Sequence, residues 1–278
     1  MDWDFQETFV AKPILFGDYL KVGVTGDERT YEPISDNSKL QRLMDAYLED
    51  YNATSPKAMH LVFFMDAIEH ISRLARIIRS PRGNAMLVGL GGSGKQSLTR
   101  LAAFMAEFIC FQIELSKGYS NTEFREDLKK LFVIAGVERQ TVVFLFTDGQ
   151  IVNEGFVEDI NSILNAGDVP NLFAPDEKDK VIGDCREYTA KLGKPLTKDS
   201  VYSTFISCVQ ANLHCVLCMS PVGEAFRRRC RMFPSLINCC TIDWYLPWPP
   251  EALADVAERF MGKVDGVSDE DKEILAKM

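Results

Sequence analysis

Apolar residues gather in five short runs that are rich in β-branched and aromatic side chains. The runs occupy residues 85–90, 108–115, 141–148, 214–221 and 239–245. A continuous apolar run of this length, rather than an alternating one, is typical of a strand that is buried on both faces. The pattern therefore predicts five core strands.

Helical patterns separate the first four runs and cover residues 95–108, 121–136 and 153–167. Gly136 and Gly167 stand where two of these helices would end. Strands that alternate with helices along a chain form a parallel sheet with helices on both faces. The predicted fold is therefore α/β, with a five-stranded parallel sheet flanked by helices.

Two further segments lie outside this alternation. Residues 57–80 carry an apolar stripe at helical spacing, which predicts one long helix that docks on the sheet. Residues 168–200 form a polar insert, and its middle predicts a short helix around Val181 to Lys191. After the last strand, Pro249 and Pro250 mark the start of another helix, because proline is tolerated in a first turn.

Composition places the chain among soluble globular proteins. It has 278 residues, of which 46% are hydrophobic and 26% charged, and a formal net charge of −9. The negative charge argues against a nucleic-acid or anionic-membrane surface. No apolar run approaches the roughly 20 residues of a membrane span, and the acidic first residues lack the apolar core of a signal peptide. We expect neither nucleic acid nor a membrane as a partner.

The eight cysteines are scattered among apolar residues, which is typical of reduced core thiols. Cys215 and Cys218 form a C-x-x-C pair, but residues three apart in a strand point to opposite faces. No second pair and no suitably spaced histidine completes a zinc site. We therefore expect no cysteine-bound metal.

A glycine-rich stretch joins the first predicted strand to its helix. It nearly matches the phosphate-binding pattern G-x-x-x-x-G-K-[ST]. Glycines let backbone N–H groups approach phosphate oxygens closely, and Lys95 supplies a positive charge for them. The predicted nucleotide-binding residues of this stretch are Gly89, Leu90, Gly91, Gly92, Ser93, Gly94, Lys95, Gln96 and Ser97.

A nucleotide site of this kind also needs Mg²⁺. Asp148 ends the third predicted strand and is expected to hold the ion. Where the pattern has a magnesium-binding hydroxyl, the sequence has Gln96, whose neutral amide oxygen is harder to place on a metal. Ser97 does not replace it, because it is rotated by about 100° around the helix. The predicted metal ligands are Asp148 and Gln96, with weakened geometry.

The residue that activates water is missing. Many hydrolysing P-loop enzymes have Glu after the strand-ending Asp, whereas this chain has Gly149. Gln150 is a poor base, and its side chain should face the other way. Rescue by Glu154, at the start of the next helix, stays open as an alternative. No residue is assigned a catalytic role.

Five segments together resemble a dynein heavy chain, specifically the fourth AAA+ module of an axonemal motor ring. They occupy residues 89–102, 144–151, 161–177, 212–221 and 233–253. Within them, LNAGDVPNLF is far more specific than the phosphate-binding pattern. The resemblance covers nearly the whole chain, including PILFGDYL near its start.

The resemblance implies an AAA+ fold in a ring of six modules, of which the first performs the main ATP hydrolysis. It implies an N-terminal flank at residues 1–60, a large α/β part at 61–250, and at 251–278 the beginning of a small helical part that stops before the stalk. Residues 268–278 should open a second helix there. The implied partners are neighbouring modules, microtubules through the absent stalk, and dynein intermediate and light chains. The implied location is the cytoplasm, the cytoskeleton and the ciliary axoneme.

The resemblance also assigns roles to single residues. Ile14, Leu15 and Phe16 should flank the adenine of ATP or ADP. Ser220 stands where AAA+ enzymes have the polar residue that senses the γ-phosphate, and Cys239 stands where an arginine finger would serve the preceding module. Both departures weaken catalysis and leave the nucleotide pocket intact.

The sequence leaves two alternatives for the role of one basic cluster, and it leaves alternatives for the function of the chain. The arginines at 227, 228, 229 and 231 form either a solvated helix face that pairs with acidic neighbours or a contact with an adjacent module. The whole chain is expected to be a nucleotide-binding regulatory module with weak or no hydrolysis. The alternatives are an ATPase completed by neighbouring modules and a structural spacer without nucleotide.

Overall fold

A five-stranded parallel sheet forms the centre of the computed structural model, which describes residues 15–261 except 22, 25 and 35. The strand order is β4–β5–β6–β3–β7. The strands are β3 (Ala85–Gly89), β4 (Ile109–Phe111), β5 (Val142–Thr147), β6 (Leu213–Met219) and β7 (Thr241–Tyr245). The predicted fold is confirmed, although the strand expected over residues 108–115 is reduced to the three residues of the edge strand β4, which pairs with β5.

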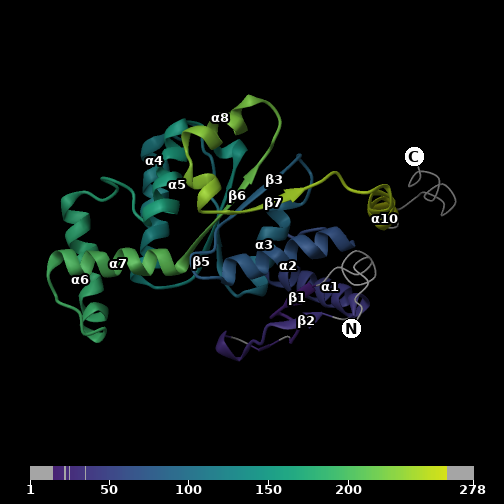
Figure 1. The fold of residues 1–278 in the computed structure, drawn as a ribbon, viewed down its shortest axis with the longest axis horizontal. Helices are drawn as coiled ribbons and strands as arrows, with labels where there is room; N and C mark the ends of the chain where they lie inside the picture. Colours follow the sequence, from purple (N-terminus) through teal and green to yellow (C-terminus); the bar gives the residue numbers. More distant parts are fainter. Residues whose placement is uncertain (1–14, 22, 25, 35, 262–278) are drawn as a thin grey trace, which may run out of the picture.

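Side chains alternate between the two faces of the sheet and build two hydrophobic cores. On β5, Phe144 and Phe146 point into one core, whereas Val143 and Leu145 point into the other. The first core is covered by α4 (Asn121–Phe132), α5 (Glu154–Ala166), α6 (Pro175–Lys191) and α7 (Lys198–Asn212), and the second by α1 (Asn37–Thr54), α2 (Met65–Arg79) and α3 (Lys95–Met105) (Figure 1).

The two cysteines of the C-x-x-C pair lie on opposite faces of β6. Cys215 belongs to the first core and Cys218 to the second, as the strand pattern predicts. Burial raises the pKa of both thiols to about 12, so both are protonated core residues. Among the described residues, no group of three or more His, Cys, Asp or Glu side chains is arranged to hold a metal ion.

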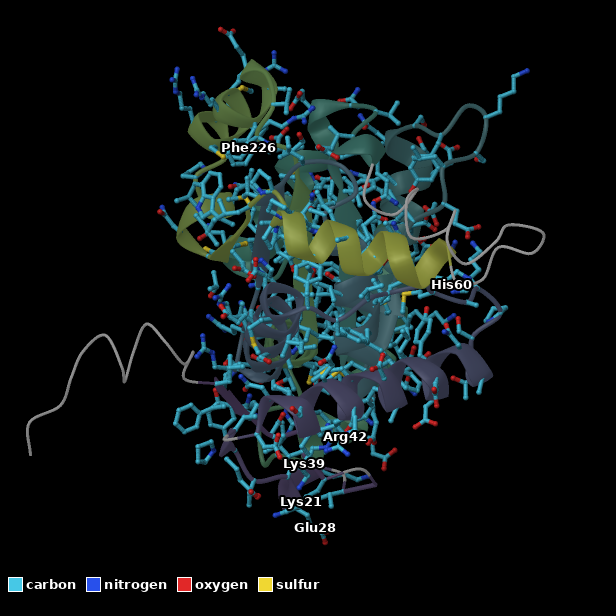
Figure 2. The ribbon with its side chains drawn as sticks, turned by 90° about the vertical axis from the view of Figure 1, so that its right-hand side faces the viewer. Lys21, Glu28, Lys39, Arg42, His60 and Phe226 are labelled. Atoms are coloured by element: carbon cyan, nitrogen blue, oxygen red, sulfur yellow. The ribbon has the colours of Figure 1, made fainter. Side chains whose placement is uncertain are left out.

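Smaller elements complete the molecule. They are the antiparallel hairpin β1 (Leu15–Gly17) and β2 (Glu32–Ile34), two single-turn 3-10 helices (Gly26–Glu28 and Asp148–Gln150) and a π-helical turn (Val133–Val137). Two helices lie between β6 and β7, namely α8 (Glu224–Met232) and α9 (Ser235–Asn238), and α10 (Pro250–Met261) follows β7. Figure 2 shows Lys21 and Glu28 of the hairpin region at one end, with Lys39 of α1 nearby, and Phe226 of α8 at the other end. No helix in the described part of the chain has the length and apolar character to cross a membrane.

The long helix expected over residues 57–80 begins only at Met65. The side chain of Asn52 donates to the Met59 carbonyl at 2.9 Å and accepts from the Met59 N–H at 2.7 Å. The side chain of Gln41 donates to the Phe63 carbonyl at 2.9 Å. These contacts with α1 satisfy backbone groups that a helix would otherwise use, so residues 59–64 form a non-helical strap.

The polar insert is more helical than predicted. Its helix starts at Pro175 rather than near Val181, with proline in the first turn. The carboxylate of Glu177 accepts the Ala174 N–H at 2.8 Å and so caps the helix. Gly167 ends α5 with a φ of 69°, which confirms its predicted place as a helix stop.

Candidate functional site

The glycine-rich loop runs from the end of β3 to the start of α3. Gly92 and Gly94 have φ values of 79° and 83°, which side-chain-bearing residues rarely adopt. A Cβ at Gly91 or Gly92 would meet no atom within 4 Å, so space lies open beside this backbone. The N–H groups of residues 92–97 find no hydrogen-bond acceptor within the described part of the chain. Free N–H groups at a helix start bind anions.

Gly89 has a different purpose. It pairs with Tyr245 of β7 in the sheet register. A Cβ at Gly89 would lie 2.6 Å from the Tyr245 Cβ and 2.8 Å from its carbonyl oxygen. This glycine therefore permits β7 to approach β3, whereas Gly91, Gly92 and Gly94 shape the loop itself.

A cleft of about 570 Å³ opens over the loop. The predicted residues that line it are Gly89, Gly91, Gly92, Ser93, Gly94, Lys95, Gln96, Ser97, Asp148 and Ser220. The cleft is also lined by residues that the sequence analysis does not assign to the nucleotide site, namely His60, Leu61, Arg100, Thr147, Cys218 and Trp248. The predicted loop, metal and sensor positions thus meet at the carboxyl end of the sheet, where α/β folds bind ligands.

Lys95 points its ammonium group into the loop. Its Nζ donates to the carbonyls of Gly89 at 2.7 Å and Leu90 at 2.6 Å, and to the Ser93 hydroxyl at 2.9 Å. Burial lowers the pKa of Lys95, and the neighbouring Cys218 and Asp148 oppose that change. The positive charge is therefore held within the loop, beside the carbonyls of Gly89 and Leu90.

Asp148 is fixed by the backbone on both sides. Its carboxylate accepts the Gly149 N–H at 2.9 Å and the Ser220 N–H at 2.8 Å. The second bond ties the end of β5 to the end of β6. Each carboxylate oxygen keeps a further lone pair, so Asp148 can also bind a cation that faces the cleft.

The side chain of Gln96 is turned toward two neighbours. Its amide oxygen accepts from Arg100 at 3.4 Å and from Gln112 at 3.5 Å. Gln96 lines the cleft, but these contacts engage the oxygen that was predicted to reach the metal ion. Of the two predicted metal ligands, Asp148 is thus the one with free coordinating capacity.

A second cavity of about 240 Å³ adjoins the cleft and shares with it His60, Leu61, Ser93, Gly94 and Trp248. The strap that precedes α2 and the residues after β7 form its walls. Phe64 and Trp248 pack edge to face, with ring centroids 5.1 Å apart. The apolar side chains that line it are Leu61, Val62, Phe64, Ala67, Leu98, Trp244, Leu246, Trp248 and Val256.

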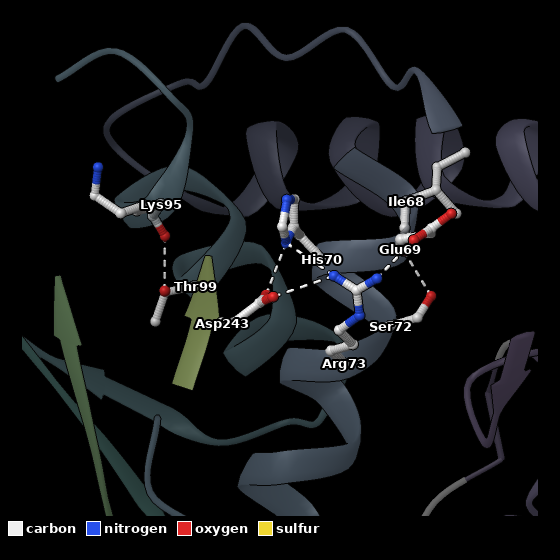
Figure 3. A network of polar contacts seen from close by, with 8 residues as sticks. All are labelled: Ile68, Glu69, His70, Ser72, Arg73, Lys95, Thr99 and Asp243. Carbon is white, nitrogen blue, oxygen red and sulfur yellow. Dashed lines mark hydrogen bonds and ion pairs between the residues drawn. The ribbon is translucent and has the colours of Figure 1, made fainter. Parts of the chain in front are cut away.

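One wall of the second cavity is a polar network that joins α2 to β7 (Figure 3). His70 Nδ1 lies 2.7 Å from a carboxylate oxygen of the buried Asp243, and Arg73 donates to the other oxygen at 3.1 Å. Arg73 also donates to Glu69 at 2.6 Å. The His70 ring stacks on Tyr245 at 3.8 Å between centroids. These contacts join α2 to β7 in the cavity wall beside the loop.

Comparison with known proteins agrees with this geometry. The family model described as "P-loop containing dynein motor region D4" matches residues 59–278. The chain belongs to this dynein family. It is 56% identical to human dynein axonemal heavy chain 6 over 98% of its length, and 47% identical to human dynein axonemal heavy chain 1 over 97%. It is 51% identical over 91% to the dynein-1-beta heavy chain of the flagellar inner arm I1 complex of Chlamydomonas reinhardtii.

The chain spans only 6–7% of the length of these axonemal heavy chains. What matches is therefore one motor region of a much longer dynein.

Gln150 and Glu154, the two side chains of this dynein region that were considered for activating water, both bind other groups of the protein. The Gln150 side chain is buried, donates to the Ile113 carbonyl at 2.6 Å and accepts the Thr147 N–H at 2.8 Å, so its predicted orientation away from the site is confirmed. Glu154 forms ion pairs with Arg228 and Arg229, both at 3.0 Å. Hydrogen bonding from Arg229 lowers the pKa of this carboxylate. Glu154 is thus a weak proton acceptor that lies outside the cleft lining.

These ion pairs also explain part of the arginine cluster in the dynein sequence. The interpretation of Arg228 and Arg229 as partners of an acidic neighbour is confirmed. Arg227 and Arg231 are exposed on α8. Cys239, at the expected arginine-finger position, is half-buried against the first core.

The residues expected beside adenine lie elsewhere in the described structure. Leu15 is buried in the second core, and the half-exposed Phe16 stacks on Tyr31 with centroids 5.7 Å apart. Neither lines the cleft or the second cavity. Ile14 lies outside the described residues, as do residues 268–278. In this dynein region the walls next to the loop come from His60, Leu61 and Trp248 instead.

Proposed function

We propose that the chain is the fourth AAA+ module of an axonemal dynein heavy chain, and that it binds ATP or ADP with little or no hydrolysis. The observation that carries this proposal is the loop of residues 92–97, whose free N–H groups and Lys95 face a cleft of about 570 Å³. Phosphate oxygens fit this combination of open backbone and positive charge.

The nucleotide would extend across both cavities. Its phosphates would lie on the loop and its nucleoside in the adjoining apolar cavity beside Phe64 and Trp248. Asp148 would hold Mg²⁺, since its carboxylate faces the cleft and retains free lone pairs. The ion would neutralise part of the phosphate charge.

Weak hydrolysis follows from the missing base. Gly149 has no side chain, Gln150 is buried, and Glu154 is paired with two arginines. Among the residues that the structure describes, no side chain is therefore placed to take a proton from an attacking water. Lys95 and Asp148 are both present, so an ATPase that neighbouring modules complete is the alternative function. The hydrolysis measurement described below distinguishes it from binding without turnover.

We further propose the biological setting from the axonemal relatives. The parent protein would be a microtubule motor of cilia and flagella, located at the axoneme within the cytoplasmic cytoskeleton. Residues 61–250 would form the large part of the module, 1–60 its N-terminal flank and 251–278 the beginning of its small helical part. Neighbouring modules of the same heavy chain would be its direct partners, and microtubules and the intermediate and light chains would contact other regions.

Binding without turnover is tested on the purified chain. We expect titration calorimetry with ADP or ATP and Mg²⁺ to show one site, and nucleotide to raise the melting temperature by mass action. We expect phosphate release no faster than that of Lys95→Ala. Gly149→Glu should also stay near background, although a Cβ there has room, since the arginine finger would come from an absent module.

Two results would contradict these expectations separately. If calorimetry shows no binding signal up to about 1 mM ADP, the proposal of nucleotide binding is wrong and the structural spacer is favoured. Steady phosphate release that Lys95→Ala abolishes would favour the competent ATPase.

The nucleoside cavity gives a narrower prediction. We expect Trp248→Ala to weaken ADP binding about tenfold, because a ring that packs on the nucleoside is lost. Inorganic pyrophosphate, which has no nucleoside, should bind the variant and the unchanged chain equally. If Trp248→Ala weakens the binding of ADP and of pyrophosphate equally in calorimetry, the adenine of the nucleotide does not lie against Trp248.

A further inference from the structure

Arg100 brings a second positive charge to the cleft. It lies one helical turn after Gln96 on α3 and lines the cleft together with Lys95 and Asp148. Its guanidinium donates to the amide oxygen of Gln112 at 2.6 Å and to that of Gln96 at 3.4 Å. The Gln112 amide also donates to Gln96 at 3.5 Å, which links the three side chains.

The guanidinium has no acidic partner among the described residues. Arginines elsewhere near the site are paired, Arg73 with Glu69 and Asp243, and Arg229 with Glu154. Arg100 is half-buried, and both of its acceptors are neutral amides. A partly desolvated charge without a counter-ion is costly, and an anion in the cleft would relieve that cost.

The free donors of Arg100 can serve such an anion. Only one terminal nitrogen is engaged by the amides, and Nε and the other terminal nitrogen find no acceptor within the described part of the chain. A guanidinium presents its donors in a planar fork that matches two phosphate oxygens.

The position of Arg100 selects one phosphate of the nucleotide. The nucleoside cavity adjoins the loop at Ser93 and Gly94. Arg100 is absent from that lining and belongs to the cleft that contains Thr147 and Asp148. A nucleotide that runs from the cavity across the loop would thus bring its terminal phosphate toward Arg100.

We propose that Arg100 binds the terminal phosphate of ATP and that Gln96 and Gln112 are positioning residues for its guanidinium. This inference rests on the proposed nucleotide binding. It gives the unusual Gln96 a purpose, because an amide oxygen at this position reaches the arginine one turn later. The site then distinguishes ATP from ADP by an interaction that ADP does not make.

The test is calorimetry of ATP and of ADP, each with Mg²⁺, on matched variants of the chain. We expect Arg100→Gln to weaken ATP binding about tenfold and ADP binding less than about threefold. Arg100→Lys keeps the charge and loses the planar fork of donors, so its ATP affinity should lie between those of the unchanged chain and Arg100→Gln. Gln112→Leu should lower the ratio of ATP to ADP affinity as well, about threefold. Arg186→Gln removes an exposed charge on α6 and should change neither ligand.

The outcomes separate this inference from the proposed function. If the unchanged chain binds nucleotide and Arg100→Gln and Gln112→Leu leave the ATP to ADP affinity ratio unchanged, the role of Arg100 is wrong and nucleotide binding stands. If the unchanged chain binds neither nucleotide, both proposals fall. Melting temperatures without nucleotide verify that the variants are folded. If Arg100→Gln does not fold, Arg100→Lys and Gln112→Leu still test the role of Arg100.

Discussion

Replacing Lys95 with alanine is expected to weaken binding of ADP and ATP by at least about 100-fold, or about 2.7 kcal/mol. The ammonium group lies among the loop carbonyls of Gly89 and Leu90, with Nζ–O distances of 2.7 and 2.6 Å. It is the residue of the loop that carries a full positive charge. Its partial burial, which lowers the pKa of Lys95, also strengthens any charge-assisted bond to a phosphate.

The measurement is titration calorimetry, supported by the nucleotide-dependent rise of the melting temperature. We expect this rise to disappear in Lys95→Ala, while the melting temperature without nucleotide stays close to that of the unchanged chain. Lys39→Ala is the matched control, because Lys39 is an exposed lysine on α1 at the hairpin end of the molecule (Figure 2). Equal affinities of Lys95→Ala and Lys39→Ala would show that the loop does not bind the phosphates.

Replacing Gly83 with alanine should have the largest effect on stability, a loss of about 3 kcal/mol in the free energy of unfolding. Gly83 lies in the turn between α2 and β3. A Cβ there would lie 1.7 Å from the Ile77 carbonyl oxygen and 2.8 Å from its carbon. Both atoms belong to the backbone of α2, so a side-chain rearrangement cannot remove the overlap. The end of the helix would have to move.

Such a movement would break a second contact. His214 Nδ1 lies 2.8 Å from the Gly83 carbonyl. A carbonyl only accepts, so Nδ1 carries the hydrogen. Burial lowers the pKa of His214, and the hydrogen bond to Gly83 opposes that change. The turn, β6 and the end of α2 are thus joined at one position.

Urea denaturation followed by circular dichroism measures this loss. Gly183→Ala is the control, since Gly183 lies exposed within α6 and a Cβ there would meet no atom within 4 Å. Alanine in a helix interior should stabilise the chain by about 0.5–1 kcal/mol. A Gly83→Ala variant as stable as the unchanged chain would contradict the close packing at this turn.

Two helices outside the alternation of strands and helices are not predicted from the sequence pattern. No helix is predicted over residues 37–54 or 198–212, although Asp36 and Thr197 cap helices there. The signal was present in the spacing of Leu40, Met44 and Leu48, which face the second core. In α7, β-branched residues such as Val201 and Val209 weaken the helical signal, and packing on the first core decides for a helix.

The strap at residues 59–64 illustrates a tertiary override. Its apolar spacing continues that of α2 and favours a helix. Side chains of α1, Gln41 and Asn52, bind its backbone instead and keep it open. This difference creates a wall of the second cavity, so His60 and Leu61 lie there although the helical spacing does not predict them as site residues.

By itself, the sequence determined the parallel α/β fold with its five core strands, the glycine-rich loop between β3 and α3, and the glycine at position 149. These features are written in neighbouring residues, where periodicity and backbone chemistry act locally. Only the tertiary structure decided that Glu154 pairs with the arginines of α8, that Gln96 and Gln112 hold Arg100, and that Trp248 closes the cavity beside the loop. Except for the contact between Gln96 and Arg100, which lie one helical turn apart, these contacts join separate elements, and only the packing of helices on the sheet brings them together.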